Sequence, residues 1–268
     1  MVMQEGYSIR DFNQGPATYA DKELADKLFE TSGLKNLSGK VVLDLMSGPG
    51  KVAIGLMSKS PDNYYVALDG VVDLLKEIKN PEIRSISGDA RALPLRSDSV
   101  DLVVVRYGLK DVPQEQQVGV LKGIHVVLKP GKRLIIADMM SPNEMKEWIN
   151  NQHSFKQQFN GRNILADGMC NIPTESEWIA NLLEAKFHVD VVDYHISQVK
   201  TSDWVNGGQI TSDQQKELDA FILAAPDEVK DKFNIRQEGG DVKVDYPVII
   251  IRATKFDRNG ENTDAESY

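Results

Sequence analysis

The sequence predicts an α/β protein with an open, mostly parallel sheet and helices on both faces. Residues 41–58 read as a buried strand, a glycine turn and a helix-forming run. Further short apolar runs alternate with helical segments along the chain. An acidic residue ends or closely follows four of these strands, at Asp44, Asp69, Asp89 and Asp138. Because the carboxyl ends of parallel strands share one edge, these acids predict a ligand site there.

The elements of this core follow from the apolar pattern. The expected strands lie at Val41–Leu45, Tyr64–Leu68, Ile83–Ser87, Val100–Val105, Leu134–Ala137, Phe187–Ile196 and Tyr246–Ala253. The expected core helices lie at 51–58, 114–128 and 175–186, the last opened by a capping box at Thr174 and Glu177. The second helix should end at Lys129-Pro130-Gly131, since proline cannot continue a helix and glycine readily caps one.

Helical segments surround this core. Residues 1–38 are expected to form an N-terminal helical lid over the ligand site, with a packing helix as an equal alternative, because Leu24 and Leu28 recur at helical spacing. A helix start at Ser141 predicts a helical cap over residues 141–172. The predicted division is 1–38 lid, 39–140 core, 141–172 cap, 173–198 and 245–255 remaining core, 199–244 second helical insertion, and 256–268 disordered tail.

The loop Gly48-Pro49-Gly50 is compatible with two cofactor classes, because Gly48-x-Gly50-x-x-Ala53 also satisfies a loose dinucleotide fingerprint. A pyrophosphate needs backbone N–H donors at a helix N-terminus. Pro49 removes one donor, and a carboxylate at Asp44 has the wrong sign for phosphates. A cationic adenosyl sulfonium suits that charge, so the loop favours S-adenosylmethionine over a dinucleotide.

Composition and net charge restrict the class of substrate. The net charge is −9 and no dense Lys/Arg cluster occurs, which argues against nucleic acid and favours a small-molecule acceptor. Cys170 is the only cysteine and is read as an inert hydrophobe in a reducing compartment. With no signal-peptide core and no membrane-length apolar run, we expect a cytoplasmic protein without a membrane span. The histidines are not spaced as paired metal ligands, so no metal is expected, and the oligomeric state is left open, a homo-oligomer included.

Six ordered stretches resemble class I S-adenosylmethionine-dependent methyltransferases, and most of all the ubiquinone/menaquinone-biosynthesis C-methyltransferase group. They are Val42–Gly50, Ala67–Asp69, Gly88–Leu95, Ser99–Val103, Tyr107–Val112 and Val126–Gly131. The resemblance covers Gly39–Met140 and implies a Rossmann-like seven-stranded sheet whose last strand is antiparallel. It departs at Met46, where such proteins usually carry a small residue, and at residues 199–245, which have no counterpart in the quinone enzymes.

The resemblance also implies roles for individual residues in binding S-adenosylmethionine. Asp44, Met46, Ser47 and Gly48 would surround the methionine moiety, Asp69 would take the ribose hydroxyls, and Gly70, Asp89 and Ala90 would meet the adenine. Arg106 and Tyr107 would face the methionine end or the acceptor, and Gly50 and the lid residue Tyr19 complete the set.

The leading interpretation is an enzyme that methylates a small molecule by in-line transfer from S-adenosylmethionine. Such a transfer depends mainly on positioning, so no catalytic residue is assigned; Tyr107, Asp111 and His153 are the candidates. Two alternatives stay open: a protein that binds S-adenosylmethionine without methylating, as a sensor or sulfonium-assisted catalyst, and an NAD-dependent oxidoreductase.

Overall fold

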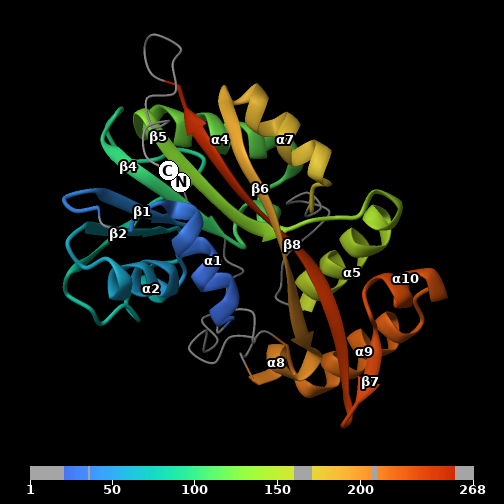
Figure 1. Cartoon of the computed structure of the whole chain (residues 1–268). Helices are drawn as coiled ribbons and strands as arrows, with labels where there is room; N and C mark the ends of the chain where they lie inside the picture. The colour runs from blue at the N-terminus through green and yellow to red at the C-terminus, as the bar shows by residue number, and fades with distance from the viewer. Residues whose placement is uncertain (1–20, 36, 160–170, 207–209, 257–268) are drawn as a thin grey trace.

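The computed structural model describes residues 21–35, 37–159, 171–206 and 210–256. Its centre is an eight-stranded sheet in the order β3-β2-β1-β4-β5-β8-β6, with β7 paired to β8 (Figure 1). The strands are β1 (Val41–Leu45), β2 (Tyr64–Asp69), β3 (Ile83–Ser87), β4 (Val100–Arg106), β5 (Leu128–Met139), β6 (Phe187–Lys200), β7 (Arg236–Glu238) and β8 (Asp241–Lys255).

The pairing confirms the predicted mostly parallel sheet. β1 pairs in parallel with β2 and β4, and β3 and β5 extend the parallel set. The last strand, β8, is antiparallel to both β5 and β6. The expected count of seven is wrong by one, because β7 is three polar residues long and carries no apolar pattern that a sequence reading detects.

Helices cover both faces of the sheet. They are α1 (Lys22–Ser32), α2 (Lys51–Lys59), α3 (Val72–Leu75), α4 (Gln114–Val127), α5 (Lys146–Phe159), α7 (Glu175–Glu184), α8 (Thr201–Asn206), α9 (Ser212–Leu223) and α10 (Asp227–Lys232), with short 3₁₀ helices η3 (Leu109–Asp111) and η4 (Asn143–Met145). Leu121 of α4 and Trp178 of α7 pack on the sheet face that carries Leu43. Leu28 of α1 and Leu56 of α2 pack on the opposite face (Figure 1).

Helix α1 is tied to the sheet at its start. Asp21 caps it by accepting the Leu24 N–H at 3.0 Å, and its other oxygen lies 2.5 Å from Nε2 of His195 on β6. Leu24 and Leu28 are fully buried. The described part of the N-terminal segment therefore packs on the sheet, whereas residues 1–20, including Tyr19, lie outside the described residues.

The second helix ends close to its expected place, since α4 runs to Val127, but two expected starts are wrong. The strand expected from Leu134 begins at Leu128, and its register against β4 shifts between Leu128 and Arg133. Gly131, at φ +72°, lets the chain bulge there rather than turn away. Ser141 does not cap a helix, because its hydroxyl donates to the Ile172 carbonyl at 2.8 Å and α5 begins five residues later.

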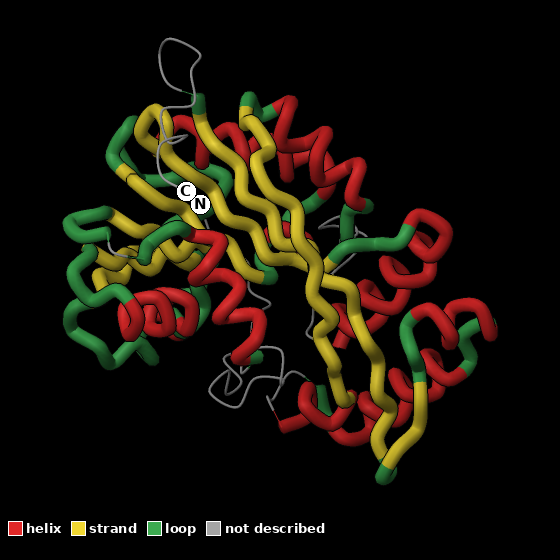
Figure 2. The backbone as a smooth tube through the Cα atoms, in the orientation of Figure 1, coloured by secondary structure: helices red, strands yellow, loops and turns green. Residues whose placement is uncertain are grey.

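Strands β6 and β8 continue as a long antiparallel pair beyond the rest of the sheet (Figure 2). Residues 199–244 contain α8, α9, α10, β7 and the far ends of this pair, and they share a third apolar core with α5. The capping box of α9 at Thr211 and Gln214 is present, as is that of α7. In the part of the chain that the structure describes, every helix is too short or too polar to cross a membrane.

Candidate functional site

The glycine loop links β1 to α2 at the carboxyl edge of the sheet. Gly48 and Gly50 have φ angles of +53° and +72°, and Gly50 is the N-cap of α2. A Cβ on Gly50 would lie 2.7 Å from Cδ1 of Ile78, whereas a Cβ on Gly48 would meet no atom within 4 Å. Gly50 is therefore required for packing, and the backbone at Gly48 is left open to a ligand.

Asp44 lies beneath this loop at the end of β1. Its side chain accepts the backbone N–H of Ala53, in the first turn of α2, at 2.9 Å, and the residue is only 1% exposed. Burial raises the pKa of Asp44 to about 7, against the opposing effects of the Ala53 hydrogen bond and the Arg106 charge. An internal carboxylate thus occupies the helix N-terminus where a dinucleotide would place its pyrophosphate.

Asp69, at the end of β2, joins the glycine loop to the neighbouring strand. Its carboxylate accepts the N–H of Gly48 at 2.7 Å and the N–H of Val71 at 2.8 Å. Burial raises its pKa, while these hydrogen bonds and one from Gly70 act against the rise. The acid therefore holds the loop in the shape that exposes Gly48.

The loop after β3 carries Asp89 and Ala90, both half-buried, at the same edge. Both carboxylate oxygens of Asp89 are engaged by Arg91, with the closest guanidinium contact at 2.7 Å. This side-chain pairing lowers the pKa of Asp89. Sequence reasoning missed the Arg91 contact, although an acid and an arginine two residues apart in a turn are a recognisable signal.

The loop after β4 lies against the glycine loop. Tyr107 has a φ of +56°, and burial raises its pKa to about 12. A Cβ on Gly108 would lie 2.8 Å from Sδ of Met46, so these two loops are in close contact. Met46 itself has a φ of +58°. The bulky residue at this position therefore fills the space between the ends of β1 and β4.

Ser47 and Arg106 border these two loops. The Ser47 N–H donates to the Leu68 carbonyl at 3.1 Å, which fixes the glycine loop to β2. Arg106 ends β4, is 9% exposed, and its charge acts on Asp44. Both residues thus lie at the edge where the resemblance places the methionine end.

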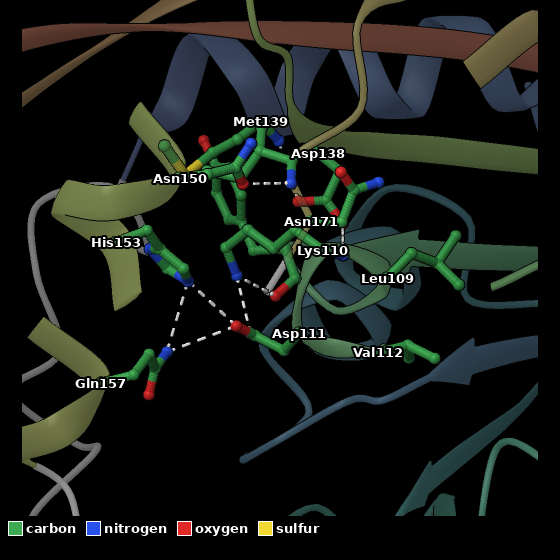
Figure 3. Close-up of polar contacts among 12 residues, drawn as sticks. Leu109, Lys110, Asp111, Val112, Asp138, Met139, Asn150, His153, Gln157 and Asn171 are labelled. Carbon is green, nitrogen blue, oxygen red and sulfur yellow. Dashed lines mark hydrogen bonds and ion pairs between the residues drawn. The ribbon is translucent and has the colours of Figure 1, made fainter. Parts of the chain in front are cut away.

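A second polar cluster begins at Lys110, in the loop after β4, and joins the core to α5 (Figure 3). His153 Nε2 lies 3.1 Å from Oδ1 of Asp111, and Gln157 donates to the same oxygen at 3.3 Å. Lys110 Nζ contacts Oδ2 of Asp111 at 2.8 Å and donates to the Tyr107 carbonyl, also at 2.8 Å. Two of the three catalytic candidates, Asp111 and His153, therefore meet directly, and Tyr107 touches the same network through its backbone.

Asp138 supports this cluster from the end of β5. It is 0% exposed and accepts the backbone N–H groups of Lys110 at 3.2 Å and Met139 at 2.8 Å. Burial raises its pKa to about 6. It therefore anchors the loop after β4 and does not face a ligand.

Sequence reasoning missed Lys110 and Gln157. Lys110 lies inside the stretch 107–112 that carries part of the resemblance. Gln157 follows His153 by one helical turn, so a helical wheel of α5 would have placed His153 and Gln157 side by side. Tyr19 and Cys170 lie outside the described residues, and the structure places neither.

Comparison with known proteins agrees with this geometry. Residues 42–131 match the family model described as a methyltransferase domain. The chain is 27% identical over 126 residues to the ubiquinone/menaquinone biosynthesis C-methyltransferase UbiE of Cereibacter sphaeroides, covering 44% of this chain and 50% of the relative. It is 34% identical over 115 residues to the demethylmenaquinone methyltransferase of Lactococcus lactis, covering 40% and 45%. The chain thus spans about half the length of the curated relatives it matches.

Solved structures resemble the chain over most of its length. The YcgJ protein of Bacillus subtilis superposes with a TM-score of 0.74 at 18% identity, over 88% of this chain and 99% of that one. Geranyl diphosphate methyltransferase, solved in complex with SAM, superposes with a TM-score of 0.56 at 11% identity, over 87% and 84%. The fold is that of these solved structures, one of them a methyltransferase, and residues 42–131 are the part that matches the methyltransferase-domain model.

Proposed function

We propose that this chain transfers a methyl group from S-adenosylmethionine to a small-molecule acceptor. The observation that carries the proposal is the acidic carboxyl edge of the sheet. There Asp44 occupies the N-terminus of α2, and Asp69 holds the glycine loop with Gly48 open to a ligand. This edge offers negative charge and an accessible backbone, which suits a cationic adenosyl ligand and disfavours a phosphorylated one.

The residues present fit that ligand. Met46, Ser47 and Gly50 frame the methionine end together with Asp44 and Gly48, while Asp69 and Gly70 border the ribose. Asp89 and Ala90 lie half-buried beyond β3, where the adenine would rest. For Asp89 to accept from an adenine amino group, its contacts with Arg91 must be shared, because Arg91 engages both oxygens.

S-adenosylmethionine supplies an activated methyl group on a sulfonium, so the protein needs mainly to orient the acceptor and exclude water. Met46, in close contact with Gly108, narrows the edge between the ends of β1 and β4. Positioning of this kind is worth roughly 7–11 kcal/mol of a barrier. An edge that orients the acceptor and keeps water from it therefore suffices for the reaction, and a strong base is not required of the chain.

The proposal also covers the acceptor class, the cellular compartment and the division of the chain. The net charge of −9 supports a small molecule over nucleic acid as acceptor. The single cysteine supports a reducing compartment, which we propose is the cytoplasm. We also propose residues 39–140 as the cofactor-binding core, with residues 141–172 and 199–244 as the segments that meet the acceptor.

Isothermal titration of the whole chain with S-adenosylmethionine, S-adenosylhomocysteine and NADH tests the cofactor assignment. We expect saturable binding of both adenosyl ligands and none of NADH. Transfer of labelled methyl from S-adenosylmethionine to extracted metabolites tests the reaction. Failure of either adenosyl ligand to bind at millimolar concentration, or tight binding of NADH, would refute the proposal.

A further inference from the structure

Helix α5 buries an unusual set of residues. Of its seven buried side chains, only Ile149 is apolar; the others are Asn150, Gln152, His153, Ser154, Lys156 and Gln157. Burying polar groups costs free energy unless they are hydrogen-bonded. A helix that covers an ordinary apolar core would not bury so many polar side chains, so the partners of these residues require an account.

The aromatic side chains of α5 do not supply those partners, because they pack on one another and on other rings of the cap. Phe155 stacks on Phe221 of α9 with ring centroids 5.2 Å apart and meets Phe159 edge-on at 5.1 Å. Trp148 lies 5.2 Å from Phe233. This aromatic cluster joins α5 to residues 199–244 and forms the core of the cap.

Two of the six polar residues, His153 and Gln157, meet the core, whereas Gln152 accepts the Tyr246 hydroxyl at 3.0 Å and Lys156 lies 4.5 Å over the Trp204 ring, both within the core of the cap. His153 and Gln157, one turn apart, both contact Oδ1 of Asp111, and Asn150 accepts the Ile172 N–H at 2.8 Å (Figure 3). Lys110 contacts the other oxygen of Asp111. Three donors from two elements thus converge on a single carboxylate.

The Asp111 carboxylate is ionised and lies just after β4, at the carboxyl edge of the sheet. Although burial acts to raise the pKa of Asp111, the Lys110 charge and the His153 hydrogen bond hold it well below its usual range. Burial lowers the pKa of His153 to about 4, so at neutral pH its imidazole is uncharged and donates from Nε2. The Asp111 side chain keeps 20% of its surface exposed, against 4% for His153 and 9% for Lys110.

We propose that Asp111 binds the methyl acceptor, and that this acceptor is a polar small molecule presenting a hydroxyl or amino hydrogen-bond donor. His153 and Gln157 are positioning residues that hold the Asp111 carboxylate toward it. The inference rests on the proposed function and deepens it. It departs from the lipid quinones that the curated relatives are named for, since the residues of α5 that meet the core are polar and its aromatic residues are engaged elsewhere.

The test follows a labelled methyl group. The whole chain is incubated with tritiated-methyl S-adenosylmethionine and, separately, an ultrafiltered aqueous extract and a chloroform extract of the cells that make the protein. We expect label in a water-soluble product from the aqueous extract. Label that enters only the chloroform extract would overturn the acceptor class while leaving the proposed function intact. Label in neither extract would refute both.

Variants then test the residue assignment. In Asp111→Asn, which keeps the shape and removes the charge, we expect the apparent KM for the aqueous extract to rise at least about tenfold, as loss of a charged hydrogen bond predicts. S-adenosylhomocysteine binding by calorimetry should stay within about twofold, because Asp111 is not assigned to the cofactor. His153→Gln should give a smaller rise in KM with kcat nearly unchanged.

His125→Gln is the matched control, because His125 of α4 packs edge-on against Phe187 of β6, away from the cluster. It should leave KM unchanged. An Asp111→Asn protein with unaltered KM would overturn the assignment. So would a rise in KM that is accompanied, in both Asp111→Asn and His153→Gln, by weaker cofactor binding and a lower melting temperature. That result would show that the cluster only holds the cap in place.

Discussion

Substitution of Asp44 by Asn should stabilise the protein while weakening cofactor binding. The buried carboxylate has a pKa raised from its ordinary value of 3.8 to about 7. A shift of about three units corresponds to about 4 kcal/mol of native-state penalty for the charged form. Asn keeps an oxygen that can accept the Ala53 N–H and cannot ionise, so it removes this penalty.

The sign of the effect follows from linkage. The native pKa of Asp44 lies above its unfolded value, so the native state binds the proton more tightly than the unfolded state. Proton binding therefore adds to the free energy of unfolding at low pH, and this contribution is lost as the pH rises toward and through 7. Between pH 5 and pH 8 the wild type should lose about 2.5 kcal/mol of unfolding free energy that Asp44→Asn does not lose.

Urea unfolding at both pH values measures this difference, with Asp101→Asn as the control, since Asp101 belongs to the same sheet and pairs with Lys129 at 2.7 Å. Calorimetry at pH 8 should show S-adenosylhomocysteine binding about tenfold weaker in Asp44→Asn, through loss of the negative charge beneath the loop that would hold the ligand's ammonium group. A stability difference between Asp44→Asn and wild type that does not change with pH would refute the reasoning. Wild-type affinity in the variant would remove Asp44 from the cofactor site.

Three further predictions concern the loops and helix ends. Asp69→Ala should weaken S-adenosylhomocysteine binding about tenfold or more in calorimetry, because the Gly48 loop loses its acceptor; unchanged affinity would contradict the assignment. Gly108→Ala should cost about 1–3 kcal/mol in urea unfolding through its clash with Met46, and a second change, Met46→Ala, should recover part of it; strictly additive effects would argue against the contact. Thr174→Ala should cost about 1 kcal/mol by breaking the α7 capping box, and no change in urea midpoint would show the box contributes nothing.

The core could be predicted because its signals are local. The apolar run of β1, the glycine loop and the α2 run are contiguous, and each strand of the parallel set is a short apolar segment of its own. The capping boxes of α7 and α9 likewise involve residues three apart. Ser141 shows the limit of such patterns: its local signal was right for a cap, but a carbonyl 31 residues away takes its hydroxyl.

The candidate site divides in the same way. The acids at strand ends could be placed at one edge from the parallel pattern, but their partners could not. Asp44 contacts the α2 backbone, Asp69 holds the glycine loop, Asp89 pairs with Arg91, and Asp138 anchors the next loop. The strand pattern alone does not distinguish these acids from one another, whereas burial and hydrogen-bond partners give each a different role in the structure.

By itself, the sequence determined the sheet type, the ligand edge and the preference for a cationic adenosyl ligand, because each depends on residue type and on spacing within a few turns of chain. Only the tertiary structure decided that His153 meets Asp111 across 42 positions. The physical reason is that the orientation of α5 depends on packing partners contributed by α9, α10 and β8, which lie far from α5 in the sequence.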